Sequence, residues 1–270
     1  MPSKVRLHGN PVVSKRRVKV RDRLFLQVLP LIVLLVAWQV TGNRVGKVMM
    51  PTVTSMLSSF YHLLLDGTLL GAFGVSIQAL VLGFFLSALL GVAVGLLMGL
   101  LPQVDRALSV YVSLLIATPI SAAVPLVVVV FGLGLAAKVV VVVLFSVGLV
   151  IVNTATGVRN VDPRLVEMAT SFGATSRQLI RHIILPGAVP MIIAGLRLAL
   201  GLAVTGMVIS ELFVVSDGVG LLVLTYSASF ETGKLYAVTA ATVLLGVVAL
   251  YLFSLLERKF SHWRPDPISD

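Results

Sequence analysis

The sequence has 270 residues, of which 58% are hydrophobic and only 12% charged, and its mean hydropathy is +1.05. Soluble domains carry about one quarter charged residues, so this composition excludes an ordinary soluble protein and indicates a membrane protein. The absence of cysteine excludes disulfides, thiolate metal sites and cysteine nucleophiles. We interpret the net charge of +10 as a signal of membrane orientation, and no nucleic-acid partner is expected.

The chain begins with a basic stretch that is followed by an apolar run. Residues 1–23 are dense in Lys and Arg, and no small-residue cleavage pattern follows the run, so a signal peptide is not expected. Residues 24–42 reach the length of about 20 apolar residues that a membrane span needs. Residues 51–65 place their apolar side chains on one helical stripe, which predicts a short amphipathic helix on the outer surface.

The second predicted span, residues 75–101, carries a small side chain at every fourth position. The stripe consists of Ala79, Gly83, Ser87, Gly91, Gly95 and Gly99. Helix association in lipid depends on close packing, and a line of small residues lets another helix approach closely. The predicted helix-packing residues are Gly83, Ser87, Gly91 and Gly95.

The third predicted span, residues 107–131, contains two prolines. Pro119 and Pro125 each remove a backbone donor, and Thr118 and Ser121 lie beside them. Broken backbone at membrane depth must be buried in protein or line a cavity. Both prolines are therefore candidates for the lining of a transport pathway, with a purely structural kink as the alternative.

Apolar length predicts six membrane-spanning helices in all, and hence an all-α membrane protein. The remaining three spans are expected at residues 139–157, 191–215 and 235–256. The predicted membrane domain covers residues 24–257, between a basic N-terminal tail (1–23) and a short C-terminal tail (258–270). The segment 217–234, which opens with Asp217-Gly218-Val219-Gly220, is interpreted as a small re-entrant or gating segment or as a plain loop.

The distribution of basic residues predicts the orientation of these spans. Most of the 21 Lys and Arg fall on the side that both termini share. The opposite side keeps only Arg44, Lys47, Lys138 and Lys234. The positive-inside rule therefore places both termini and residues 162–190 in the cytoplasm.

The longest markedly polar stretch between two apolar regions is residues 162–190. A first short helix is predicted to end at Gly173 in a left-handed turn. Thr175 and Gln178 form a capping box for a second helix, which Pro186 is expected to end. A helix–glycine–helix unit between spans suggests a docking element, and an ordinary connecting loop is the alternative.

Two charged side chains fall inside predicted spans, where ionisable residues are functional candidates. Arg197 and Glu211 lie about 21 Å apart along one helix, so they do not pair with each other. Arg197 is expected near the cytoplasmic end, where its side chain can snorkel. Glu211 lies toward the outer end and is a pathway candidate, with a solvated carboxylate at the interface as the alternative.

The sequence offers no catalytic constellation and no metal-ligand spacing. Residues 42–47 are one residue too short between their glycines for a phosphate loop, and Val48 follows where Ser or Thr is needed. Any use of ATP is therefore expected to depend on a separate partner.

The polar stretch carries a motif with a specific spacing. The motif reads Glu167-Met168-Ala169, then Gly173, nine further residues and Ile183-Ile184-Leu185-Pro186. It resembles the E-A-A---G-(nine)-I-x-L-P signature of permease subunits of bacterial binding-protein-dependent ABC importers. Met168 replaces the first alanine. The resemblance covers residues 24–258, and it points to the nitrate/sulfonate/taurine-type branch. Its further matches are Pro125-Leu126, Phe131-Gly132-Leu133-Gly134, Lys138, Asn153-Thr154, Gly157-Val158-Arg159, Gly195-Leu196-Arg197 and Glu211.

The resemblance implies a type I importer permease of the bacterial inner membrane that moves a small organic or inorganic anion. It implies a second permease copy (a homodimer), two cytoplasmic ATPase subunits and an extracytoplasmic binding protein as partners. ATP and magnesium would be bound by the ATPase, so this chain is expected to hold no cofactor and to be no enzyme. The residues that would couple to the ATPase, within residues 162–186, are Glu167, Ala169, Gly173, Ile183, Leu185 and Pro186.

Two other functions remain as alternatives. A secondary transporter would work without ATP and should show an inverted repeat with paired interrupted helices, neither of which is clear in the sequence. A membrane scaffold without transport activity would leave the proline-containing span and the cytoplasmic helix pair without a purpose.

Overall fold

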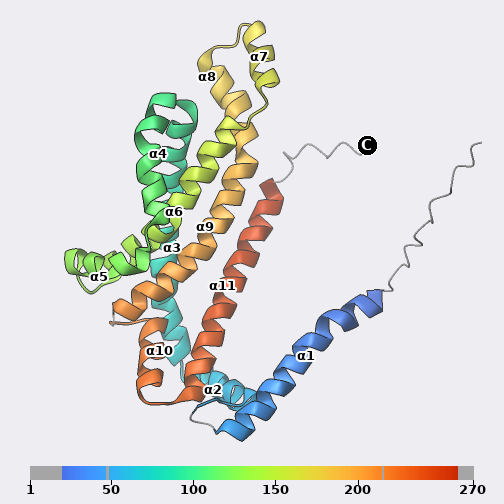
Figure 1. Cartoon of the computed structure of the whole chain (residues 1–270), viewed down its shortest axis with the longest axis vertical. Helices are drawn as coiled ribbons and strands as arrows, with labels where there is room; N and C mark the ends of the chain where they lie inside the picture. The colour runs from blue at the N-terminus through green and yellow to red at the C-terminus, as the bar shows by residue number, and fades with distance from the viewer. Residues whose placement is uncertain (1–19, 47–48, 215, 261–270) are drawn as a thin grey trace, which may run out of the picture.

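The computed structural model describes residues 20–46, 49–214 and 216–260, and every regular element in these ranges is helical (Figure 1). In chain order these are α1 (Val20–Val45), α2 (Val53–Leu65), α3 (Thr68–Leu100), α4 (Pro102–Ala117), α5 (Ile120–Phe131), α6 (Leu135–Arg159), α7 (Pro163–Ser171), α8 (Ser176–Leu179), the π-helical turn η1 (Ile180–Ile184), α9 (Leu185–Phe213), α10 (Val219–Ala228) and α11 (Thr232–Phe260). The predicted all-α fold is confirmed. We call the end of the bundle that carries α7 and α8 the α7 end, and the opposite end, with α2 and α10, the α10 end (Figure 1).

The core of the fold is a pair of parallel helices, α3 and α6. Four glycines of α3 leave space that side chains of α6 fill, so that an added Cβ would overlap them. In order, Gly83, Gly91, Gly95 and Gly99 face Val142, Val150, Thr154 and Val158. Both sets advance in the same direction, so the helices run parallel. The small-residue stripe thus lies at a helix–helix contact, as its spacing predicts.

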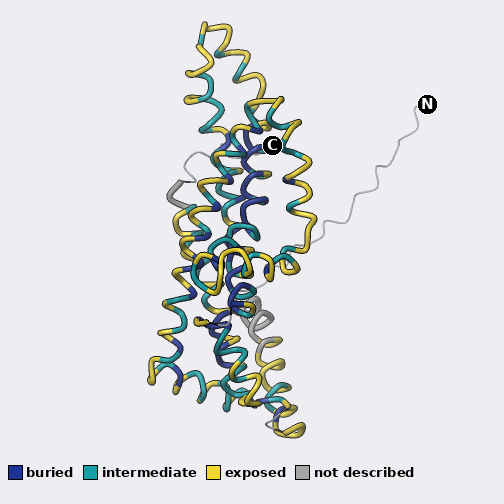
Figure 2. Tube along the Cα trace, turned by 90° about the vertical axis from the view of Figure 1, so that its left-hand side faces the viewer, coloured by how far each residue is buried: buried dark blue, intermediate teal, exposed yellow. Residues whose placement is uncertain are grey.

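α9 packs against α6 in the opposite direction. The contacts pair Gly157 with Met191, Gly195 with Asn153, and Gly206 with Phe145. The order along α9 reverses the order along α6, so these two helices are antiparallel. Burial is concentrated on α3, α6 and α9, the central helices of the bundle (Figure 2).

The third predicted span is not one straight helix. It is divided into α4 and α5, which meet at an angle of 100°. Thr118 precedes Pro119 and is held extended (ψ 132°), as the ring of a following proline favours, and this conformation ends α4. Pro125 lies inside α5 without ending it. The break is therefore at the first proline, and the second is tolerated.

Four helices are long and apolar enough to cross a membrane, and the bent α4–α5 pair makes a fifth if it counts as one span. α3 and α6 are parallel, so the chain must return between them, and this supports one crossing by the pair. Within the described residues α1 contributes only the shorter apolar helix Ile32–Val45. The six-span count therefore stays a prediction.

Pro186 does not end a helix, contrary to the prediction from the sequence. The helix that starts at α8 continues through η1 into α9, over Ser176–Phe213. In η1 the N–H of Leu185 donates to the carbonyl of Ile180, one residue further back than in an α-helix. This π turn resets the hydrogen-bond ladder just before the proline, so the missing donor falls at the start of α9.

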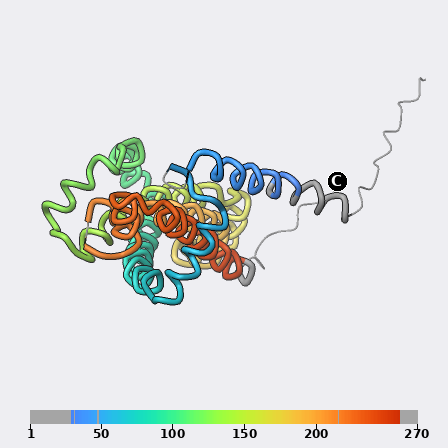
Figure 3. Tube along the Cα trace, turned by 90° about the horizontal axis from the view of Figure 1, so that it is seen from below, coloured from blue at the N-terminus to red at the C-terminus, as the bar shows by residue number. Residues whose placement is uncertain are grey.

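The N-terminal helix lies apart from the bundle. Figures 1 and 3 show α1 extending away from the other helices and meeting them at α2. Trp38 fixes this junction: its indole N–H donates to the Pro51 carbonyl at 3.0 Å, and its ring lies 5.9 Å from that of Tyr236. The predicted amphipathic helix at 51–65 is present as α2, which packs against α11. The predicted N-terminal tail lies, up to residue 19, outside the described residues.

Candidate functional site

The segment 162–186, predicted to be a docking element, projects from the α7 end (Figure 1). Gly173 joins its two short helices with a φ of +78°, a conformation that costs glycine little and other residues more. The predicted capping box is present: Thr175 accepts from the Gln178 N–H, and the Gln178 side chain accepts from the Thr175 N–H at 2.8 Å. Local sequence therefore accounts for the helix–glycine–helix shape.

One side of this segment is apolar and uncovered. α7 has no buried residue. Three large apolar side chains in α7 or directly after it are exposed: Phe172 (87%), Met168 (53%) and Leu165 (47%). Of the predicted coupling residues, Glu167 and Gly173 are also exposed and Ala169 is half-buried. Ile183, Leu185 and Pro186 are half-buried in the helix that follows, so they belong to the base of the segment and not to its exposed surface.

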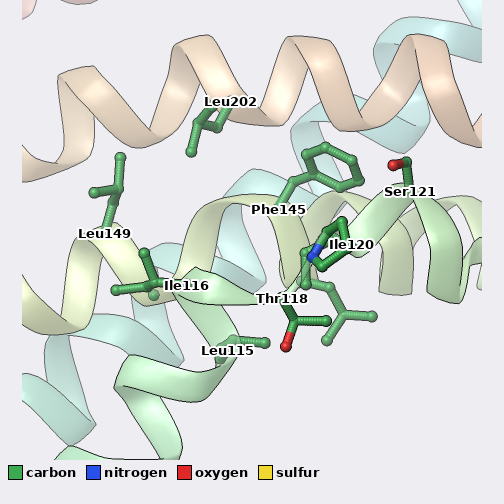
Figure 4. Close-up of a pocket in the computed structure, with 11 residues that line it drawn as sticks. Leu115, Ile116, Thr118, Ile120, Ser121, Phe145, Leu149 and Leu202 are labelled. Carbon is green, nitrogen blue, oxygen red and sulfur yellow. The ribbon is translucent and has the colours of Figure 1, made fainter.

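A cavity of about 310 Å³ opens at the break between α4 and α5, near the middle of α6 and α9. Figure 4 shows its walls: Ile116 of α4 lies opposite Leu149 of α6 and Leu202 of α9, and Phe145 of α6 and Thr118 at the break also line it. Its volume lies at the lower end of the range for small-molecule sites, about 300–1,000 Å³. Pro119 belongs to the lining, whereas Pro125 does not. The broken backbone thus lies beside a cavity, as membrane depth requires.

A buried polar cluster joins the helices at the α10 end. Glu211 of α9 has no exposed surface, and its carboxylate accepts from the Ser76 hydroxyl of α3 at 2.7 Å and from the Gly220 N–H of α10 at 3.0 Å. The Ser76 hydroxyl oxygen accepts in turn from the Val219 N–H at 3.0 Å. The carboxylate therefore lies at the N-terminus of α10, where the helix dipole favours a negative charge.

Lys138 completes this cluster, and its burial within a helix corrects the prediction from the sequence. It was expected as an outer loop residue, but it lies in α6 and is 1% exposed. Its ammonium group forms an ion pair with Asp217, donates to the Asp217 carbonyl at 3.0 Å, and lies 3.7 Å from Glu211. The alternative of a solvated Glu211 at the interface is wrong, because that carboxylate is enclosed and paired.

Arg197, the other charge predicted inside a span, lies apart from this cluster. Its side chain is 55% exposed and lies 3.5 Å from Glu257 of α11. Arg197 and Glu211 do not pair, as their spacing along the helix predicts. The three candidate regions are therefore an exposed docking segment, a cavity and a buried ionic cluster, at different heights along the bundle.

The sequence model of the family described as binding-protein-dependent transport system inner membrane component matches residues 87–262. The chain belongs to this family. It is thus a permease subunit of an ABC importer, as the signature in residues 167–186 indicates.

Related permeases match almost the whole chain. The aliphatic sulfonates transport permease protein SsuC of Bacillus subtilis is 34% identical over 239 residues, which is 88% of this chain and 86% of the relative. SsuC of Escherichia coli is 32% identical, with 84% and 88% covered. The taurine transport system permease protein TauC of Escherichia coli is 29% identical, with 94% and 96% covered.

Solved importer structures share the fold of this permease. An inward-facing form of the MetNI methionine ABC transporter aligns with a TM-score of 0.60 at 20% identity, covering 74% of this chain and 99% of the other. A chain of an amino acid ABC transporter aligns with a TM-score of 0.52 at 22% identity, covering 69% and 94%. At these identities the likeness concerns the fold alone.

Sequence reasoning missed the partner of Glu211 in this permease. One signal was available: Lys138 and Glu211 are opposite charges at the same end of two neighbouring apolar helices. Opposite charges in an apolar environment are expected to form an ion pair, because a buried charge without a partner is costly. The glycines at 218 and 220 were a second signal, because a Cβ at either position would overlap Glu211.

Proposed function

We propose that this permease moves a small sulfonate-type anion through the membrane and is driven by a separate ATPase that binds residues 162–186. The observation that carries the proposal is the exposed helix–glycine–helix with its signature spacing, at the end of a helix that continues into the core. Membership in the importer family supports an ATPase and a binding protein as partners.

The surface of the segment suits such docking. Phe172, Met168 and Leu165 offer an apolar face without a partner in the described chain, and aromatic anchors of this kind often dominate interface energies. Exposed Arg164, Arg177 and Glu167 surround that face with charge, and a polar rim of this sort favours a specific orientation. The ATPase groove is therefore expected to be apolar at its centre and charged at its edge.

Gly173→Val tests this assignment. A β-branched residue strains the +78° backbone, so the segment should lose its shape while the spans stay inserted. We expect loss of ATPase co-purification and of uptake. Gly67→Val is the matched control: Gly67 also has a positive φ (+75°) and open space around it, but lies at the α10 end. Normal co-purification and uptake with Gly173→Val would refute the docking assignment.

The substrate proposal rests on the relatives named as sulfonate and taurine permeases. A riboflavin transport permease of Chloroflexus aurantiacus, 30% identical over 235 residues, shows that one fold of this kind is also named for a larger, neutral compound. Thermal-shift screening of the cognate binding protein distinguishes a sulfonate-type substrate from riboflavin. Stabilisation by taurine or alkane sulfonates supports the proposal, and stabilisation by riboflavin alone contradicts it.

We place the pathway along the cavity at the α4–α5 break, and we propose that two copies form it. α5 presents exposed apolar side chains on which a second copy would pack: Leu126 (68%), Val129 (83%) and Val130 (74%). Because the chain has no cysteine, Val129→Cys provides a single thiol for cross-linking. Cross-linked dimers in membranes are expected, and only monomers would contradict the pairing.

In the proposed orientation the α7 end faces the cytoplasm. The charge bias supports this orientation, and Lys138, which was counted on the opposite side, lies at the α10 end beside Asp217. Single cysteines at Phe172 and Thr225, both exposed, report the two sides. An impermeant maleimide added to intact cells should label the thiol at position 225 and not the one at 172; the reverse result would invert the topology.

A further inference from the structure

The buried cluster at the α10 end has no part in ATPase docking or in lining the cavity. It draws side chains from α3, α6 and α9 and from the loop before α10: Ser76, Lys138, Glu211 and Asp217. Three of the four side chains are at most 1% exposed, whereas that of Asp217 is 53% exposed. Lys138 therefore bridges a carboxylate in the interior and one that the outer solution reaches.

α10 is a short, separate helix that this cluster attaches to the bundle. Its ten residues span about 15 Å, half of what a membrane crossing needs. A residue with positive φ lies at each end: Gly218 (+90°) and Phe230 (+56°). Residues at the ends of an element can act as hinges that absorb changes in φ and ψ. The polar contacts at its first turn, through Val219 and Gly220, join α10 to α3 and α9.

α10 packs over the end of the bundle that is formed by α3 and α9. Figures 1 and 3 place it beside the end of α9, on the same side of the bundle as α5. Leu222, Val223 and Tyr226 pack on the core that includes Leu80 and Met207. Gly218 and Gly220 bring the backbone so close to Glu211 that a Cβ on either would overlap it. The N-terminus of α10 therefore fits closely against Glu211.

We propose that Lys138 is a positioning residue for transport: by holding Asp217 and Glu211 together it latches α10 closed over the outer end of α3 and α9, and the latch opens during the cycle. This inference rests on the proposed function and orientation. A simple brace would also need these contacts, but binding protein and ATP would then not change the access of the outer solution to the buried face of α10.

A thiol on that buried face distinguishes the two roles. Val219 is 1% exposed and Thr225 is exposed, and the chain has no cysteine of its own. We would make Val219→Cys and Thr225→Cys in the full complex with ATPase and binding protein, and measure labelling by an impermeant maleimide. Each is combined with Lys138→Met, with Lys138→Arg, or with Arg44→Met, which removes an exposed basic residue from the last turn of α1 at the same end.

Lys138→Met should raise the labelling rate at position 219 on the order of tenfold, within the usual range of coupling between sites, and leave the rate at 225 unchanged. Lys138→Arg and Arg44→Met should leave both rates as in the parent. If Lys138→Met does not insert, Asp217→Asn serves instead, because it keeps Lys138 beside Glu211.

Binding protein with ATP should raise labelling at position 219 in the parent complex. Unchanged labelling at 219 in both latch variants overturns the latch. A response to Lys138→Met without any effect of binding protein and ATP would identify a static brace and overturn the latch, and ATP-dependent uptake by the same complex would show that the proposed function stands.

Discussion

Two carboxylates on neighbouring helices show how surroundings decide what a charge contributes. Glu211 is fully enclosed with Lys138, whereas Glu257 (24% exposed) lies 3.5 Å from Arg197 (55% exposed). Removing one member of a buried pair leaves the other uncompensated, which costs about 3–5 kcal/mol, whereas an exposed pair contributes about 0–1 kcal/mol.

We therefore predict that Glu211→Ala lowers stability by about 3–5 kcal/mol and Glu257→Ala by less than about 1 kcal/mol. Glu211→Gln should fall between them, since an amide oxygen still accepts from the Gly220 N–H. Thermal unfolding of the purified permease in detergent measures all three. Equal losses for Glu211→Ala and Glu257→Ala would contradict the buried pair.

Asp217 gives the outer end a dependence on pH. The hydrogen bond from Lys138 lowers the pKa of Asp217 below its ordinary value of 3.8. A lowered pKa means that the stabilisation is fully present above pH 3.8 and is lost as the pH falls through the folded-state pKa. Asp217→Asn should make stability less dependent on pH below about pH 4. An unchanged slope of stability against pH in that variant would show that the contact contributes nothing.

At the scale of single helices, the α3–α6 contact depends on the absence of side chains. At Gly91 an added Cβ would overlap Val150, whereas at Gly74 in the same helix it would meet nothing within 4 Å. We predict that Gly91→Leu destabilises the permease by about 1–3 kcal/mol, the usual cost of overpacking, and that Gly74→Leu does not. Both are compared by thermal unfolding, and similar stabilities would rule out the close contact.

The cavity at the α4–α5 break gives a second prediction at this scale. Leu202 of α9 lines it, and Leu198, one turn earlier on the same helix, does not. Leu202→Phe should fill part of the 310 Å³ and lower the initial rate of uptake several-fold, while ATPase co-purification stays normal. Leu198→Phe is the control. If both variants transport at the parent rate, substrate does not pass through this cavity.

The helices that the sequence predicted well are those in which one physical effect dominates. The spacing of small residues on α3 predicted a packing face, and Thr175 with Gln178 predicted a helix start, because both signals are local. The prediction that Pro186 ends a helix was wrong, because η1 shifts the backbone hydrogen bonds just before this proline and the helix continues. Proline alone also did not say which of Pro119 and Pro125 would break the span; Thr118, held extended before Pro119, decided this.

The candidate sites divide in the same way. The helix–glycine–helix shape of residues 162–186 could be predicted from the sequence, because its glycine and its capping residues are local signals. The cluster around Glu211 was not found, because Ser76, Lys138 and Asp217 come from three distant parts of the chain. Only the parallel packing of α3 with α6 and the antiparallel packing of α9 bring them together.

At the scale of the whole molecule, α6 touches every candidate region. It carries Lys138 at one end, lines the cavity with Phe145 and Gly148, and leads into α7 at the other end. There an ion pair of 2.7 Å between Arg159 and Asp105 holds its last turn against α4. Residues 162–186 are therefore joined to the cavity and to the buried cluster by one helix that packs on both α3 and α9.

The most direct measurement of this account is uptake of taurine or an alkane sulfonate by proteoliposomes that contain the permease, its ATPase and the binding protein. We predict uptake that requires ATP on the side of the α7 end, that Gly173→Val abolishes, and that Gly67→Val leaves intact. Uptake that proceeds equally without ATP, or that survives Gly173→Val, would contradict an ATP-driven permease coupled through residues 162–186.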